Sequence, residues 1–165
     1  MVTILVADND DGEFSAELSD ALSGYFNEGE LKLYDIKSSP PTVNDSVIVV
    51  YKQPQPTVFQ FQGSGVAVAI VDSGDEALLE HVSGTRLPAI TCGLRSRDTI
   101  TLSSMAKKST VIDLRRSVSC LDGSTVEPQE IPLRHKKTND NFLLMTMAAI
   151  LILCGKVEKL KEGYI

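Results

Sequence analysis

Carboxylate and hydroxyl side chains cluster directly after two apolar runs of the sequence. The two clusters consist of Asp8, Asp10 and Asp11, which follow residues 2–7, and of Asp72, Ser73 and Asp75, which follow residues 66–71. In open α/β sheets, ligands bind outside the carboxyl ends of the strands. The first cluster offers the oxygen ligands that a hard cation such as Mg²⁺ prefers. Both clusters also suit the cap and the positive end of a following helix. We predict a ligand site at these residues, with helix capping as the alternative, and we assign no metal site.

Four arginines stand out in an acidic chain, whose formal net charge is −6. They are Arg95, Arg97, Arg115 and Arg116, and a further basic stretch lies at residues 134–137. If the neighbouring runs stack as hairpins, these side chains could share a face and bind an anion or an acidic partner. They could equally be strand-edge charges that discourage aggregation. The acidic balance argues against a nucleic-acid partner, because contacts to phosphates need a basic surface.

No residue pattern predicts nucleophilic or metal chemistry. The two histidines, His81 and His135, are isolated, and no motif places either beside a serine or a cysteine. Cys92, Cys120 and Cys154 are far apart and lie in apolar runs, which indicates buried thiols in a reducing cytoplasm. We therefore predict no catalytic residue and no cofactor.

The elements that position these residues follow from the patterning. Residues 2–7, 45–51, 66–71 and 88–92 are strand-like segments in which apolar residues follow one another instead of alternating with polar ones, which is typical of parallel strands covered on both faces. Residues 31–36 form a shorter strand-like run. Phe14, Leu18 and Leu22 have helical spacing, and residues 75–83 form a second helix that Gly84 should end. This order predicts an α/β, Rossmann-like three-layer fold with a mostly parallel sheet flanked by helices.

The pattern changes after residue 93. Residues 99–102, 109–118 and 127–133 are strand-like runs with no helix between them, and Asp122 and Gly123 form a hairpin turn signal. We predict an antiparallel β-hairpin extension, followed by a buried apolar helix near residues 142–154. The chain of 165 residues should be a single α/β domain, with a parallel-sheet part (1–94), the extension (95–138) and a C-terminal helix (139–157).

The hydropathy pattern predicts no membrane partner. The longest apolar run has 13 residues, whereas about 20 are needed to span a bilayer. The N-terminal residues lack the basic region of a signal peptide. A cytoplasmic protein is expected, and homo-oligomerisation stays open.

Four segments in the same order resemble the distal half of the central ATPase domain of Mur ligases, which add amino acids to peptidoglycan precursors. They are VAIVDSGD at residues 68–75, AITCGL at 89–94, the hairpin around Asp122 and Gly123, and MAAI at 147–150. The resemblance covers residues 66–156. It implies a Rossmann-like fold and a nucleotide near Asp72 and Asp75.

The chain departs from that family where the family binds its nucleotide. The family's phosphate loop has a Gly-Lys-Ser/Thr pattern, and none occurs in this sequence. Its last helix opens with a His-Asn-x-x-Asn run, and here Asn141, Phe142 and Met145 stand in those slots. Phe and Met cannot form the paired hydrogen bonds of an amide.

Residues 1–56 resemble response-regulator receiver domains more weakly. ILVADND at residues 4–10 is similar to their first strand and acidic pair, and DSVIVVYKQP at 45–54 to their third strand. Val50 occupies the slot of the phosphorylated aspartate, and the late lysine of receivers has no counterpart in residues 88–95.

These observations favour a non-catalytic, Mur-ligase-like bacterial protein that binds a partner or small ligand, with a link to cell-wall metabolism implied by resemblance only. The alternative is a receiver-like signalling interaction module that lacks the phosphoacceptor. The ligase hypothesis requires an antiparallel unit leading into the last helix, and the receiver hypothesis requires strand order 2-1-3-4-5 with the acids at residues 8–11 facing Val50. An enzyme with an unrecognised acidic pocket is a third class.

Overall fold

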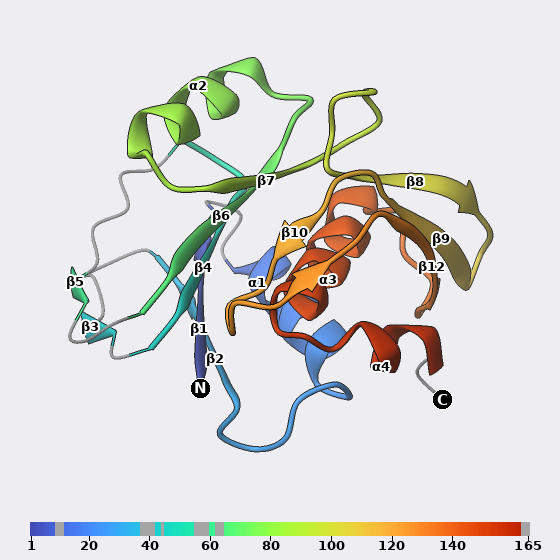
Figure 1. The fold of residues 1–165 in the computed structure, drawn as a ribbon, viewed down its shortest axis with the longest axis horizontal. Coiled ribbons are helices and arrows are strands. Elements are labelled where there is room, and N and C mark those ends of the chain that lie inside the picture. Colours follow the sequence, from blue (N-terminus) through green and yellow to red (C-terminus); the bar gives the residue numbers. More distant parts are fainter. Residues whose placement is uncertain (9–11, 37–41, 44, 55–59, 62–64, 163–165) are drawn as a thin grey trace.

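An eight-stranded sheet organises the chain in the computed structural model, which describes residues 1–8, 12–36, 42–43, 45–54, 60–61 and 65–162. Its strands lie in the order β12-β9-β8-β7-β6-β4-β1-β2 (Figure 1). These strands are β1 (Val2–Ala7), β2 (Leu31–Asp35), β4 (Val47–Tyr51), β6 (Ala67–Asp72), β7 (Ala89–Cys92), β8 (Ile100–Met105), β9 (Ser109–Leu114) and β12 (Gln129–Arg134). Two short strands, β3 (Thr42–Val43) and β5 (Gln60–Phe61), pair with each other outside this sheet.

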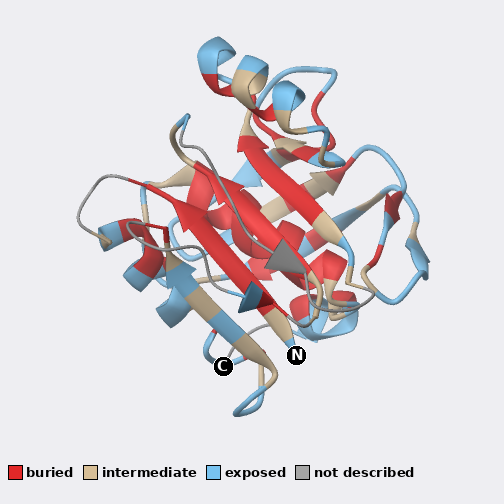
Figure 2. Ribbon diagram, turned by 90° about the vertical axis from the view of Figure 1, so that its left-hand side faces the viewer, coloured by how far each residue is buried: buried red, intermediate tan, exposed pale blue. Residues whose placement is uncertain are grey.

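Six strands, in the order β2-β1-β4-β6-β7-β8, run parallel. The central ones are buried on both sides, as Figure 2 shows, which explains their continuous apolar runs. Because successive side chains of a strand point to opposite faces, Ile4 and Val6 belong to one apolar cluster and Leu5 and Ala7 to another. The predicted three-layer α/β fold is confirmed.

Helices cover the two faces of the sheet unequally. The first cluster is completed by α1 (Glu13–Leu22), α3 (Asn141–Leu153) and α4 (Val157–Glu162), and the second by α2 (Glu76–Thr85). Figure 1 shows α1 and α3 on one side of the parallel strands and α2 on the other. Twelve of the 13 residues of α3 are buried, as its uniform apolar composition predicts. No helix within the described ranges has the length and apolar character needed to cross a membrane.

The antiparallel extension after residue 93 is also confirmed. β8 pairs with β9 and β9 with β12, both antiparallel. Because β8 also pairs in parallel with β7, the extension continues the main sheet, and it leads into α3. Pro132 lies in β12, the edge strand, where a missing backbone N–H is tolerated. The predicted hairpin forms between β10 (Val118–Ser119) and β11 (Thr125–Val126), with Gly123 at φ +87°. The run at 109–118 is not one strand, because the chain leaves the sheet after Leu114.

The predicted end of α2 at Gly84 is wrong. The helix includes Gly84 and continues to Thr85, and Arg86 follows in the left-handed conformation at φ +59°. The Thr85 hydroxyl donates to the carbonyl of Val82 and accepts from the backbone N–H of Leu87, which closes this terminus. A non-glycine residue thus takes the position that glycine usually occupies after a helix.

Candidate functional site

The parallel strands bring three of the predicted acidic residues to one edge of the sheet. Ala7 pairs with Tyr51 and Asp72 with Cys92, so β1, β4, β6 and β7 end together. Asp8, Asp72, Ser73 and Asp75 follow the ends of β1 and β6 on this carboxyl edge. Asp10 and Asp11, also predicted here, lie outside the described residues. We call this region the carboxyl edge.

Asp8 lies deep in the carboxyl edge, with only 3% of its surface exposed. The backbone N–H groups of Lys52 and Gln53 both donate to the carbonyl of Ala7, which fixes the end of β4 beside the end of β1. Gly12, the N-cap residue of helix α1, has φ +84°, and a Cβ there would lie 3.3 Å from Oδ2 of Asp35. Carboxylates therefore approach the start of α1, where phosphate-binding proteins place backbone N–H groups and a lysine.

The acids after β6 bond to the backbone of their own turn. Oδ1 of Asp72 accepts from the N–H of Gly74 at 2.8 Å, and Oδ1 of Asp75 accepts from the N–H of Leu78 at 3.0 Å. Asp75 is the N-cap of α2, so helix capping is observed for this residue. A ligand role for these acids stays a prediction.

Sequence reasoning missed Asp98, which joins this cluster from the turn after β7. Asp98 is 2% exposed, and its Oδ2 accepts from the backbone N–H of Arg95 at 2.8 Å. A Cβ at Gly93 would lie 2.6 Å from this Oδ2 and would overlap the Oγ of Ser73, itself 4% exposed. The run R-S-R-D looks like an exposed loop, and only the glycine before it hints at a close approach.

The buried thiol in this cluster is a poor nucleophile. Burial raises the pKa of Cys92 far above its ordinary value, and the negative charges of Asp98 and Asp72 raise it further. The thiolate, which is the reactive form, is therefore disfavoured. Burial likewise raises the pKa of Cys154 to about 12.

The histidines lie apart, on α2 and after β12. The ring of His81 packs edge-on against Tyr51 at 5.6 Å, and His135 bonds to Thr110. Within the described part of the chain, no group of three or more His, Cys, Asp or Glu side chains is arranged to hold a metal ion.

The structure brings two of the four predicted arginines together. Arg115 donates from Nη1 to the carbonyl of Arg95 at 3.2 Å and forms an ion pair from Nε to Asp113 at 3.1 Å. It therefore ties the end of β9 to the turn after β7. Arg97 and Arg116, which are close to them in the sequence, are exposed. Binding of an anion or an acidic partner by these four arginines stays a prediction.

Among solved structures, MurF from Acinetobacter baumannii matches 99% of this chain with a TM-score of 0.53 and 9% identity. The fold of this chain resembles that of a Mur ligase. The chain matches 45% of the MurF chain, so it spans less than half of that protein.

A second structure from the same organism is named UDP-N-acetylmuramoylalanyl-D-glutamyl-2,6-diaminopimelate–D-alanyl-D-alanyl ligase. It has 10% identity and a TM-score of 0.44 over 99% of this chain and 46% of its own. No family model matches this sequence, and neither does any curated protein. The likeness to MurF is therefore one of fold, and it extends beyond residues 66–156 to the first strands.

Proposed function

We propose that this chain is a non-catalytic, Mur-ligase-like binding protein of the bacterial cytoplasm, which binds a small ligand or a partner at the carboxyl edge. The observation that supports it best is the junction of β1 and α1. The residues from 8 to 13 read D-N-D-D-G-E, without the Gly-Lys-Ser/Thr that would neutralise phosphates. Buried Asp8 and exposed Glu13 at this junction would repel a polyphosphate.

The lysine that follows β4 does not compensate for the missing phosphate-loop lysine. Nζ of Lys52 lies 4.4 Å from the centroid of the Phe14 ring, a cation–π contact at the start of α1. Phe14 in turn stacks on Phe142 with ring centroids 5.7 Å apart. Phe142 and Met145, which stand in the family's base-contacting slots, are 7% and 3% exposed and pack in the core. Side chains that could serve a nucleotide are thus used for packing.

The carboxyl edge favours a ligand that donates hydrogen bonds or has positive charge, because carboxylates from the ends of three strands lie there beside the single charge of Lys52. A role in cell-wall metabolism rests on the fold likeness to MurF alone, and function does not follow from fold. We include it as the direction in which to search for the ligand.

A thermal-shift screen with ATP and Mg²⁺, UDP-sugars and divalent cations tests this proposal, together with an ATP hydrolysis assay. We expect no hydrolysis and no shift with ATP, and a concentration-dependent shift with a ligand that is lost in Asp72→Asn. Asp140→Ala is the matched control for Asp75→Ala, because Asp140 caps α3 through the N–H of Leu143 as Asp75 caps α2. ATP hydrolysis that disappears in Asp72→Asn or Asp75→Ala but persists in Asp140→Ala would refute the proposal.

One observation favours the receiver-like interaction module as a second candidate. The first five strands of the main sheet, counted along the chain, lie in the order 2-1-3-4-5 that this hypothesis requires, which is β2-β1-β4-β6-β7 in the labels of Figure 1. Val50, in the phosphoacceptor slot, is fully buried and pairs with Val6 of β1. This candidate predicts that no small molecule of the screen shifts the melting temperature. It also predicts that the chain binds a specific protein partner. A saturable small-ligand shift that depends on Asp72 would argue against it.

A further inference from the structure

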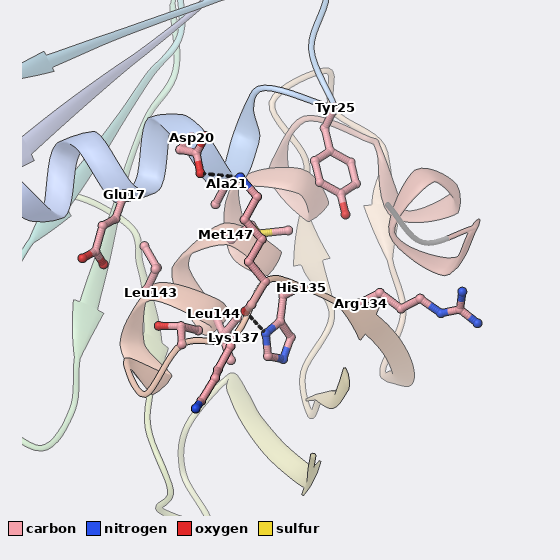
Figure 3. A pocket seen from close by; sticks show the side chains of 12 residues that line it. Glu17, Asp20, Ala21, Tyr25, Arg134, His135, Lys137, Leu143, Leu144 and Met147 are labelled. Carbon is pink, nitrogen blue, oxygen red and sulfur yellow. Dashed lines mark hydrogen bonds and ion pairs between the residues drawn. The ribbon is translucent and has the colours of Figure 1, made fainter. Parts of the chain in front are cut away.

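A pocket outside the carboxyl edge lies between α1, α3 and the segment that connects β12 to α3. We call this segment, residues 135–140, the link. The volume of the pocket is about 290 Å³, near the lower end of small-ligand sites. Figure 3 shows the side chains that line it. They include the basic stretch at residues 134–137 but none of the residues at the carboxyl edge, so the inference is independent of the proposed function.

The floor of the pocket is apolar. Leu143, Leu144 and Met147 come from α3 and are 6%, 3% and 3% exposed, and Ala21 faces them from α1. Since Ala21 is small, it leaves room between the two helices. An aliphatic group placed there would be removed from water, which is favourable by about 25 cal/mol per Å² of apolar surface.

An ion pair spans the mouth of this pocket. Nζ of Lys136, on the link, lies 2.9 Å from Oδ2 of Asp20 on α1, as the dashed line in Figure 3 marks. Both side chains are largely exposed, at 75% and 63%. Exposed ion pairs contribute little to stability, about 0–1 kcal/mol, so another carboxylate can replace Asp20 at modest cost.

The surroundings of the mouth are basic in an acidic chain. Arg134 and Lys137 line the pocket, and an adjoining hollow of about 440 Å³ is lined by both of them and by Lys108. Within the described part of the chain, the side chains of these three residues form no hydrogen bond or ion pair. Glu17 is the acid that lines the pocket besides Asp20. The unpaired charge at the mouth is therefore positive on balance and attracts an anion.

The link is fixed before any ligand arrives. Nδ1 of His135 is 2.7 Å from the carbonyl of Lys136, which can only accept, so Nδ1 holds the proton. Nε2 is 2.8 Å from the hydroxyl of Thr110, a residue only 2% exposed. The bond to Thr110 anchors the link to β9 and the bond to Lys136 holds the backbone of the link, so the basic side chains need little reorganisation to bind.

We propose that this pocket binds a small aliphatic carboxylate. The hydrocarbon chain lies on Leu143, Leu144 and Met147, and the carboxylate takes the place of Asp20 at Lys136. Lys137 and Arg134 are near enough to the mouth to add charge attraction. A carboxylate is favoured over other head groups because the mouth already holds one against Lys136.

Calorimetric titration of the full chain with octanoate tests the proposal, with octanol and octylammonium as uncharged and positively charged controls. We expect saturable binding of octanoate and binding at least about fivefold weaker for both controls, which corresponds to one exposed charge pair. Methyl NMR signals of Leu144 and Met147 should shift during the titration. Equal binding of octanoate and octanol, or no saturable binding, would overturn the proposal.

Variants with opposite expected effects sharpen the test. Asp20→Asn removes the competing carboxylate and should tighten octanoate binding about two- to fivefold, whereas Lys137→Glu should weaken it by at least as much. Lys32→Glu, on exposed β2 surface, makes the same change in net charge and should leave affinity unchanged. Weaker binding in Asp20→Asn, or equal losses in Lys137→Glu and Lys32→Glu, would contradict the assigned place of the head group.

Discussion

Replacing Gly93 with alanine should destabilise the protein at the carboxyl edge. The new Cβ would overlap the Oγ of Ser73 and would lie 2.6 Å from Oδ2 of Asp98. The backbone has little freedom to retreat, because the N–H of Gly93 donates to the carbonyl of Ile100 at 3.1 Å and the N–H of Ser73 to that of Cys92 at 3.0 Å. Overpacking of this kind costs about 1–3 kcal/mol of unfolding free energy. For a chain of this size that corresponds to a loss of about 2–12 °C in Tm.

The same substitution at Gly84 is the matched control. Gly84 lies in α2, is exposed, and a Cβ there would meet no atom within 4 Å. Alanine at an exposed helix position is favoured over glycine by about 0.5–1 kcal/mol. Replacing glycine with alanine should therefore lower the free energy of unfolding at Gly93 and raise it at Gly84. Adding Ser73→Gly to Gly93→Ala should recover part of the loss, since it removes one of the two overlaps.

Urea unfolding followed by circular dichroism measures these differences, because the chain has no tryptophan for fluorescence. Unchanged m-values would show that the midpoints report stability. If Gly93→Ala proved as stable as the parent chain, or if Ser73→Gly gave no recovery, the close packing of Ser73, Gly93 and Asp98 would be refuted.

Two further predictions concern the surface of the fold. The backbone N–H of Asn27, then the side chains of Lys156 and Asn27, bond to Glu30 and lower its pKa from 4.5 to about 2. Since the pKa of Glu30 is lower in the folded than in the unfolded chain, this stabilisation is complete above pH 4.5 and is lost as the pH falls toward 2. Glu30→Gln should therefore flatten the decline of Tm between those two pH values. Arg86→Gly should raise the unfolding free energy by up to about 1 kcal/mol in urea titrations, because glycine adopts φ +59° without the strain of a side chain. If Tm fell with pH as steeply in Glu30→Gln as in the parent chain, the first argument would be contradicted. A lower urea midpoint in Arg86→Gly would contradict the second.

The parallel strands could be predicted from sequence because their environment is uniform. Val47–Tyr51 is covered on both faces, so every side chain is apolar and the run is continuous. Helix α3 was predictable for the same reason. The short polar side chains at residues 138–140, before the apolar run, all suit its cap, and the structure shows that Asp140 is the residue used. In both cases the residues within one segment determine the outcome.

The remaining features depend on partners distant in sequence. Asp98 looks like a solvated turn residue, and its burial results from Ser73 and Gly93 on neighbouring strands. The basic stretch at 134–137 looks like edge charge, and only the packing of α1 against α3 turns it into the rim of a pocket. A single sequence contains no local signal for such contacts, so composition alone leaves capping, solvation and binding open.

The topology agrees with one requirement of each functional hypothesis, so the side chains must separate the two. The first five strands of the main sheet have the order that the receiver hypothesis requires, and the antiparallel unit leading into α3 is the one that the ligase hypothesis requires. The two features occupy different halves of one sheet, so neither excludes the other. Chemistry separates them: a valine, Val50, fills the phosphoacceptor slot, whereas Asp8 and Asp72 remain at the carboxyl edge. A phosphoryl group has no acceptor at Val50, but a ligand that donates hydrogen bonds has partners at the carboxylates, and this asymmetry favours ligand binding over signalling.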